Sequence, residues 1–304
     1  MRSDKTKDLI HFHFLVFLWG FTSILGALIE LNSIQIVWHR MFIASFLVGL
    51  YIITSKRKMF FIKRKYFTQL LIAGLLISSH WVAFFYAIKI SGVSLTLSIM
   101  ASGAFLTSLI EPLVFKRKFS IKELTFGSIT LLGLIIIFRA EFDQLLGMSI
   151  AFLATLLSVI FTIINSKLVK DKLSPTSITF YELFFGWFLI SLYMLFDINQ
   201  IKTLFIFNQD DLILLLILGS ICTAYAHVGS VKVMRNLSPF SFMIIINLEP
   251  VYAVILSLIF FGKNELMSVD FYIGFSLILI AIFLDSLDKR NTRLKKLTEK
   301  KLHL

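Results

Sequence analysis

Ten runs of predominantly apolar residues, each about 20 residues long, dominate this sequence, with short charged segments between them. A helix needs roughly 20 apolar residues to cross the hydrocarbon core of a bilayer. We therefore predict an all-α integral membrane protein with ten transmembrane helices. The runs cover residues 9–29, 34–54, 67–88, 92–115, 121–138, 145–166, 176–196, 212–233, 239–261 and 268–286.

The composition excludes the main soluble classes. Hydrophobic residues make up 58% of the 304 residues and charged residues 16%, against about 45–50% and about 25% in a typical soluble domain. A soluble enzyme would expose large apolar patches, and a disordered chain needs the opposite balance. The single cysteine, Cys222, excludes an intrachain disulfide and a cysteine-based zinc cluster.

The positive charges predict how the chain lies in the membrane. Of the 30 Lys and Arg residues, 25 fall on the side of the N-terminus, four fall on the opposite side and Arg40 lies inside a span. Because cytoplasmic loops carry an excess of Lys and Arg, we predict a multi-pass protein of a bacterial inner membrane with both termini cytoplasmic. The net charge of +12 is then a topology signal, and no nucleic-acid partner is predicted. The basic tail, residues 288–304, either lies on anionic headgroups or is solvated.

The two halves of the chain resemble each other. Span 2 aligns with span 7 at an offset of 142 residues and span 3 with span 8 at 147, which predicts repeats over 1–140 and 141–287. Five spans per half is an odd number, so the second half enters the membrane from the opposite side. Such inverted repeats are typical of secondary transporters. The matching pairs are Phe42/Phe184, Phe46/Phe188, Leu47/Leu189, Leu50/Leu192, Tyr51/Tyr193, His80/His227 and Ser91/Ser238.

An ordered set of short motifs is similar to one transporter family. The motifs are Trp19-Gly20, Arg40, Tyr86-Ala87-Ile88-Lys89, Ser91, Leu237-Ser238-Pro239, Leu248-Glu249-Pro250-Val251-Tyr252, Phe261-Gly262 and Gly274. In this order the chain resembles the EamA-like branch of the ten-span drug/metabolite transporter superfamily. It departs from the family where Lys263-Asn264 follows Gly262 and displaces an acid to Glu265. The resemblance implies efflux of amino acids or similar metabolites, coupled to protons or to exchange.

Ionisable residues in the middle of a span are the first candidates for a functional site, because each costs about 2.5–3.5 kcal/mol on insertion scales. His80 and His227 lie about halfway along spans 3 and 8. Glu249 lies about halfway along span 9, directly before Pro250, which removes a backbone hydrogen bond and can open the helix. Glu249 is the main candidate for proton coupling, and the two histidines either line the cavity or hydrogen-bond across helices.

Two further charges occupy equivalent positions of the repeat. Arg40 and Glu182 either form a buried ion pair or act as two separate gate charges. Glu111, near the end of span 4, is expected either to pair with the basic segment between spans 4 and 5 or to extend to the lipid headgroups. The aromatic candidates for the cavity wall are Trp19, Trp81, Tyr181 and Tyr225.

These features favour a secondary active exporter of small metabolites that works by alternating access. No nucleotide-binding G-x-x-x-x-G-K-[ST] loop occurs, and no H-E-x-x-H or paired mid-span Asp occurs, so ATP hydrolysis and the common intramembrane enzyme sites have no support. We predict no enzyme activity, no cofactor and no metal. An importer of the same fold and an enzyme using a serine with His80 remain as alternatives. Oligomeric state, substrate and direction stay open, and a monomer is compatible with the sequence.

Overall fold

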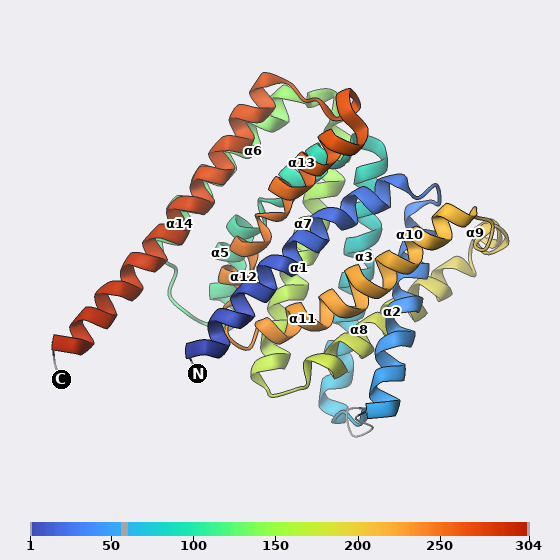
Figure 1. Cartoon of the computed structure of the whole chain (residues 1–304), viewed down its shortest axis with the longest axis horizontal. Helices are drawn as coiled ribbons and strands as arrows, with labels where there is room; N and C mark the ends of the chain where they lie inside the picture. The colour runs from blue at the N-terminus through green and yellow to red at the C-terminus, as the bar shows by residue number, and fades with distance from the viewer. Residues whose placement is uncertain (1, 56–59, 303–304) are drawn as a thin grey trace.

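The computed structural model describes the backbone of residues 2–55 and 60–302, and the side chains of 7–55, 60–263, 265–281, 283–284 and 287–288. All regular structure in these ranges is helical, which confirms the predicted all-α class. Figure 1 shows the helices, which are α1 (Arg2–Leu28), α2 (Ser33–Ser55), α3 (Phe67–Ser91), α4 (Val93–Met100), α5 (Gly103–Phe115), α6 (Ile121–Ala140), α7 (Leu145–Lys170), α8 (Pro175–Met194), α9 (Ile198–Thr203), α10 (Gln209–Gly219), α11 (Ala226–Val233), α12 (Pro239–Ile246), α13 (Glu249–Phe261) and α14 (Val269–Leu302). Short 3-10 helices are η2 (Arg64–Tyr66), η3 (Phe142–Gln144) and η5 (Gly262–Glu265). A further short segment, η4 (Ser220–Tyr225), is π-helical.

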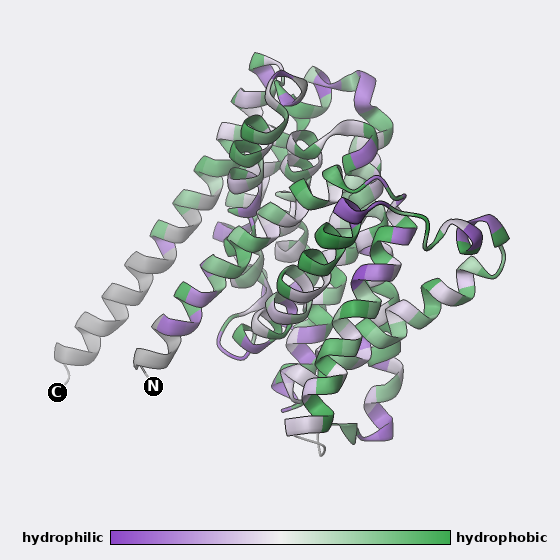
Figure 2. Ribbon diagram, turned by 45° about the vertical axis from the view of Figure 1, so that its right-hand side comes forward, coloured by the Kyte–Doolittle hydropathy of each residue, from purple (hydrophilic) through white to green (hydrophobic). Residues whose placement is uncertain are grey.

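Nine helical segments within the described ranges are long and apolar enough to cross a membrane. The tenth predicted span lies in α14, where the apolar stretch Val269–Ala281 is shorter. The count of ten therefore stays a prediction. Large apolar side chains face outward along the helices, among them Phe46, Leu132 and Phe188, and Figure 2 shows hydrophobic residues along much of the length of the helices. The backbone of the predicted basic tail is helical to Leu302, and most of its side chains lie outside the described set.

Two of the spans are broken near their middle, at equivalent places in the two halves. Span 4 consists of α4 and α5, with a turn at Ala101–Ser102 between them. Span 9 consists of α12 and α13, with a turn at Asn247–Leu248. The second break precedes Pro250, which cannot donate a backbone hydrogen bond. Each break places the end of one half-helix and the start of the next inside the bundle, which is a common construction of transporter binding sites.

Span 8 contains a different irregularity. Its centre, η4, is a π-helical turn between α10 and α11. The hydroxyl of Thr223 in this turn donates to the carbonyl of Leu218 at 2.6 Å. Such turns widen a helix and reorient its side chains, and they are frequent at functional sites.

The helices pack in a bundle with one outlying pair. Helix α3 lies against α7 and α8, α2 lies against α8, and α1 lies against α13. Helices α6 and α14 lie side by side at one edge of the bundle (Figure 1). They meet at Gly133 and Gly274, where a Cβ atom on Gly133 would lie 2.5 Å from the Gly274 carbonyl oxygen. The absence of side chains at this crossing lets the two backbones approach closely.

Candidate functional site

A cavity of about 70 Å³ lies between the two broken spans. Helices α1, α2, α3, α4, α7, α11, α12 and α13 all contribute to its wall. Six of the nine residues proposed from sequence line it, namely Trp19, Arg40, His80, Trp81, His227 and Glu249. At about 10–15 Å³ for each water-sized group, the cavity has room for roughly five of them. It is therefore of a size for a small molecule or a cluster of waters.

Arg40 supplies a positive charge to this wall and is 2% exposed. Its Nε donates to the hydroxyl of Thr223 at 2.6 Å, so the π-helical turn of span 8 holds the guanidinium in place. The guanidinium carbon lies 3.7 Å from the ring centroid of Trp81, a cation–π contact. Nη1 has no hydrogen-bond partner among the described residues. A buried guanidinium nitrogen without a partner can donate to an anionic ligand.

His80 and His227 approach the same cavity from α3 and α11. Nδ1 of His80 lies 2.8 Å from the carbonyl oxygen of Ala154 on α7, and because a carbonyl only accepts, this nitrogen carries the proton. The ring of His227 stacks on Phe161, with centroids 5.7 Å apart. Both rings therefore have fixed orientations at the cavity wall.

Glu182 lies directly behind His227. Nε2 of His227 is 3.1 Å from Oε2 of Glu182, and Asn165 donates to the same oxygen at 3.3 Å. The carboxylate is fully buried, and its Oε1 has no hydrogen-bond partner in the described structure. Arg40 and Glu182 form no ion pair with each other, since Arg40 is held by Thr223 and Glu182 by His227. The partner of each charge could not be read from the repeat alone.

Glu249 begins α13 directly after the break of span 9 and is 7% exposed. No hydrogen bond or ion pair joins its carboxylate to another described residue, although the charge of Arg40 acts on it across the cavity. Asn247 in the break lines the same cavity at 1% exposure. Neither its Oδ1 nor its Nδ2 has a partner within the described ranges. An unpartnered guanidinium nitrogen, carboxylate and amide thus face one small space.

The two tyrosines proposed from sequence lie elsewhere. The hydroxyl of Tyr181 donates to the carbonyl of Phe60, near the segment between α2 and α3. The hydroxyl of Tyr225 lies 2.7 Å from Nε2 of His11, and its side chain is about half exposed. Neither residue contributes to the cavity wall.

Sequence comparison assigns this architecture to a family. The sequence profile of the EamA-like transporter family matches residues 9–139 and again residues 145–287. The chain belongs to the EamA-like transporter family. It is therefore a multi-pass membrane protein of the drug/metabolite transporter type, which confirms the predicted family. No protein of curated function matches the chain.

A solved structure shares the fold of this EamA-like transporter. It is titled "Crystal structure of protein" and superposes with a TM-score of 0.67 at 12% sequence identity. The match covers 94% of this chain and 98% of that chain. At this identity the likeness concerns the fold alone.

Sequence reasoning missed two features of the site. Asn247 is uncharged and lies in an apolar run, so no charge distinguishes it; the signal was its place two residues before Glu249 and three before Pro250. Thr223 was missed because its role depends on the π-helical turn that points it at Arg40. No group of three or more His, Cys, Asp or Glu in the described part of the chain is placed to hold a metal ion.

Proposed function

We propose that this EamA-like transporter is a secondary exporter of small zwitterionic metabolites, such as amino acids, working by alternating access in a bacterial inner membrane. Both termini are cytoplasmic in this proposal, as the positive-inside rule favours. Transport is driven by protons or by exchange. The observation that carries the proposal is that Arg40 Nη1 and the carboxylate of Glu249 face one cavity and that neither has a hydrogen-bond partner among the described residues.

The charge balance of the cavity supports a zwitterion as substrate. The guanidinium of Arg40 can bind a carboxylate through Nη1, and the carboxylate of Glu249 can bind an ammonium group. Burying a charge without a partner is costly, so a ligand with both charges leaves neither protein group unpaired. The amide of Asn247 can donate to the ligand carboxylate or accept from its ammonium group. Trp19 and Trp81 in the wall offer apolar surface against which a short side chain can pack.

The same arrangement supports coupling to a proton. When Glu249 is protonated, the ammonium of the substrate loses its anionic partner and binding weakens. When Glu249 is ionised, the substrate ammonium takes the place of the proton. Proton and substrate thus compete for one carboxylate, a simple basis for moving them in opposite directions across the membrane.

The decisive experiment measures flux in proteoliposomes with a panel of matched compounds. The panel contains small neutral amino acids, the corresponding carboxamides, which lack the anion, and the corresponding carboxylic acids without the amine. We expect flux only for the amino acids, and a loss of at least about tenfold in Arg40→Gln. Tyr225→Phe, which removes a hydroxyl outside the cavity, is the matched control and should transport normally.

Three outcomes would contradict the proposal. Equal flux of the carboxamides would show that no anion site is used. Accumulation of substrate only on the cytoplasmic side, against its concentration gradient, would identify an importer. A purified Arg40→Gln protein that transports at the wild-type rate would show that Arg40 is not part of the substrate site.

A further inference from the structure

The N-terminal end of each broken span is capped by a carboxylate from the other half of the chain. Helix α4, the first part of span 4, begins at Val93. The amide nitrogens of Val93 and Ser94 donate to Oε1 and Oε2 of Glu265 at 2.8 and 2.9 Å. Glu265 belongs to η5, directly after α13, and is 8% exposed. The second repeat thus caps a half-helix of the first.

The backbone before α4 is shaped around this contact. Gly92 has φ of +80°, a region that residues with a side chain rarely adopt. A Cβ atom on Gly92 would also lie 3.0 Å from Oε1 of Glu265. Glycine is therefore needed both for the turn and for the approach of the carboxylate.

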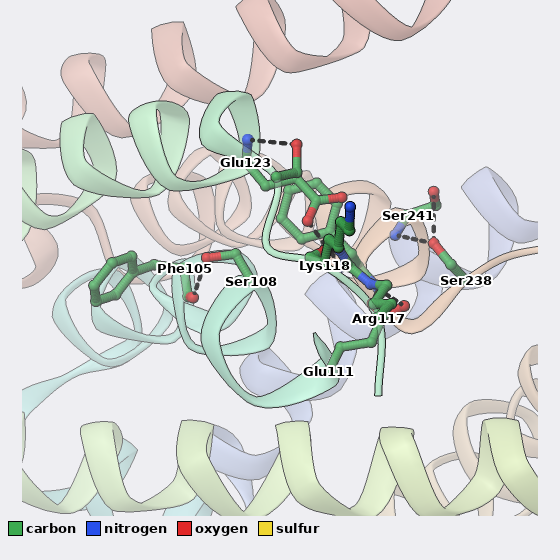
Figure 3. A network of polar contacts seen from close by, with 10 residues as sticks. Phe105, Ser108, Glu111, Arg117, Lys118, Glu123, Ser238 and Ser241 are labelled. Carbon is green, nitrogen blue, oxygen red and sulfur yellow. Dashed lines mark hydrogen bonds and ion pairs between the residues drawn. The ribbon is translucent and has the colours of Figure 1, made fainter. Parts of the chain in front are cut away.

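The equivalent half-helix of the second repeat is capped in the reverse direction. Helix α12 begins after Ser238, and the amide nitrogen of Phe240 donates to Oε2 of Glu111 at 2.8 Å. Glu111 lies on α5 of the first repeat and is 4% exposed. Its Oε1 is 3.5 Å from Nε of Arg117, as expected from the basic segment that follows α5. Figure 3 shows Glu111 and Arg117 beside Ser238 and Ser241 at the start of α12.

The two contacts lie at opposite ends of the bundle. Helix α12 starts on the side where α1 begins, which we call the N-terminal side, and α4 starts on the opposite side. Helix α4 packs against α13, and α12 packs against α5. Glu265 therefore joins α4 to the end of α13 on the opposite side, whereas Glu111 joins α12 to α5 on the N-terminal side.

Both half-helices lead directly to the cavity. The last residues of α4 and the turn that follows, Met100 and Ala101, line its wall. Ile246 and Asn247, at the end of α12, line it as well. A half-helix released at its N-terminal end can pivot at the break, because the ladder of helical hydrogen bonds is interrupted there. Such a movement separates α4 from α13, or α12 from α5, and connects the cavity to one side.

We propose that Glu265 and Glu111 are the latches of two alternating gates, each closing one side of the cavity by capping the half-helix of the opposite repeat. Both latches are engaged in this structure. In the transport cycle one opens while the other stays bound. The proposal rests on the proposed transport function, but its test measures access to the cavity and needs no substrate.

The experiment uses a single cysteine in the cavity wall as the reporter. Ser158→Cys in a Cys222→Ala background is labelled with a membrane-impermeant thiol reagent in vesicles of both orientations. We expect Glu265→Gln to raise the labelling rate from the opposite side by about tenfold, because hydrogen bonds to a charged group are lost. Glu111→Gln should raise it by a similar factor from the N-terminal side. Each variant should lower labelling from the other side.

Matched controls exist on both sides. Glu141 accepts hydrogen bonds from Ser268 before α14, an unbroken helix, so Glu141→Gln removes a cap between the halves without touching a gate. Asp8 accepts from Asn236 on the N-terminal side, and Asp8→Asn is the control there. Neither should change the labelling rate.

The outcomes separate the latches from the substrate proposal. If labelling shifts but no amino acid flux is measured, the latch proposal stands and the proposed substrate is wrong. Unchanged labelling in folded Glu265→Gln and Glu111→Gln proteins would overturn the latches, whatever the flux. Glu265→Asp, which keeps the charge but shortens the side chain, should show the same shift to a smaller degree. If Glu265→Gln and Glu265→Asp both failed to fold, the proposal would also be overturned, because a contact that opens in every cycle cannot be required for folding.

Discussion

His227 and Glu182 form a buried pair across α11 and α8, with Nε2 of the histidine 3.1 Å from Oε2 of the carboxylate. The histidine ring reaches the cavity wall, whereas the carboxylate is fully buried behind it. The pair links the ring at the wall to α8, a helix that contributes no residue to the cavity lining. His227 therefore provides a direct contact between the cavity wall and Glu182.

The partner of Glu182 can be tested with a double-mutant cycle. Glu182→Leu leaves the ring nitrogen of His227 and the amide of Asn165 without their hydrogen-bond partner, so we expect a strong loss of folding stability. Combining it with His227→Leu should reveal a coupling of about 0.5–3 kcal/mol in the free energy of unfolding in detergent. The control cycle of Glu182→Leu with Arg40→Leu should be additive within about 0.5 kcal/mol. Strong coupling in the control cycle would mean that Arg40 and Glu182 pair after all.

Glu249→Gln tests the competition between proton and substrate. The amide resembles the protonated carboxyl in shape and cannot release a proton. We expect the variant to retain exchange of substrate for substrate at a reduced rate while losing net export driven by a pH gradient. Flux in proteoliposomes with and without a pH gradient measures both activities. Export against a substrate gradient with unchanged pH dependence would show that coupling lies in another residue.

Opposite labelling of two positions tests the topology. Gln209 begins α10, and Thr298 lies in the basic tail. In a Cys222→Ala background, a cysteine at position 298 should react only from the cytoplasm and one at position 209 only from outside, because the charge distribution places them on opposite sides. An impermeant thiol reagent applied to intact cells and to inverted vesicles distinguishes the two. Labelling from the same side would contradict ten spans.

The crossing of α6 and α14 should tolerate no added methyl group. In Gly133→Ala the new Cβ would lie 2.5 Å from the backbone oxygen of Gly274, so the two helices must separate. We expect a loss of about 1–3 kcal/mol in the free energy of unfolding in detergent. Leu132→Ala, at a neighbouring position with a side chain 58% exposed, is the control and should change stability by less than about 0.5 kcal/mol. Equal stability of the two variants would mean that α14 does not pack closely on α6.

Much of the architecture follows from sequence because its causes are local. Apolar runs of span length predict helices, since only helices satisfy the backbone of a single segment in lipid. The offset between the halves pairs His80 with His227, and the structure brings both to one cavity. The depth of Arg40 and Glu249 along their spans was enough to mark them as candidates, because charge in mid-membrane is costly wherever the other helices lie.

Tertiary structure decided which groups meet. Arg40 and Glu182 occupy equivalent positions in the repeat. Arg40 nevertheless hydrogen-bonds to Thr223 in the π-helical turn, whereas Glu182 pairs with His227. Glu265, three residues after Gly262, reaches the start of α4 some 170 residues earlier in the chain. Sequence spacing determines depth and face within one helix, because the rise and turn of a helix are constant. Which helix lies opposite, and at what rotation, depends on packing between segments distant in sequence, and no local pattern records it.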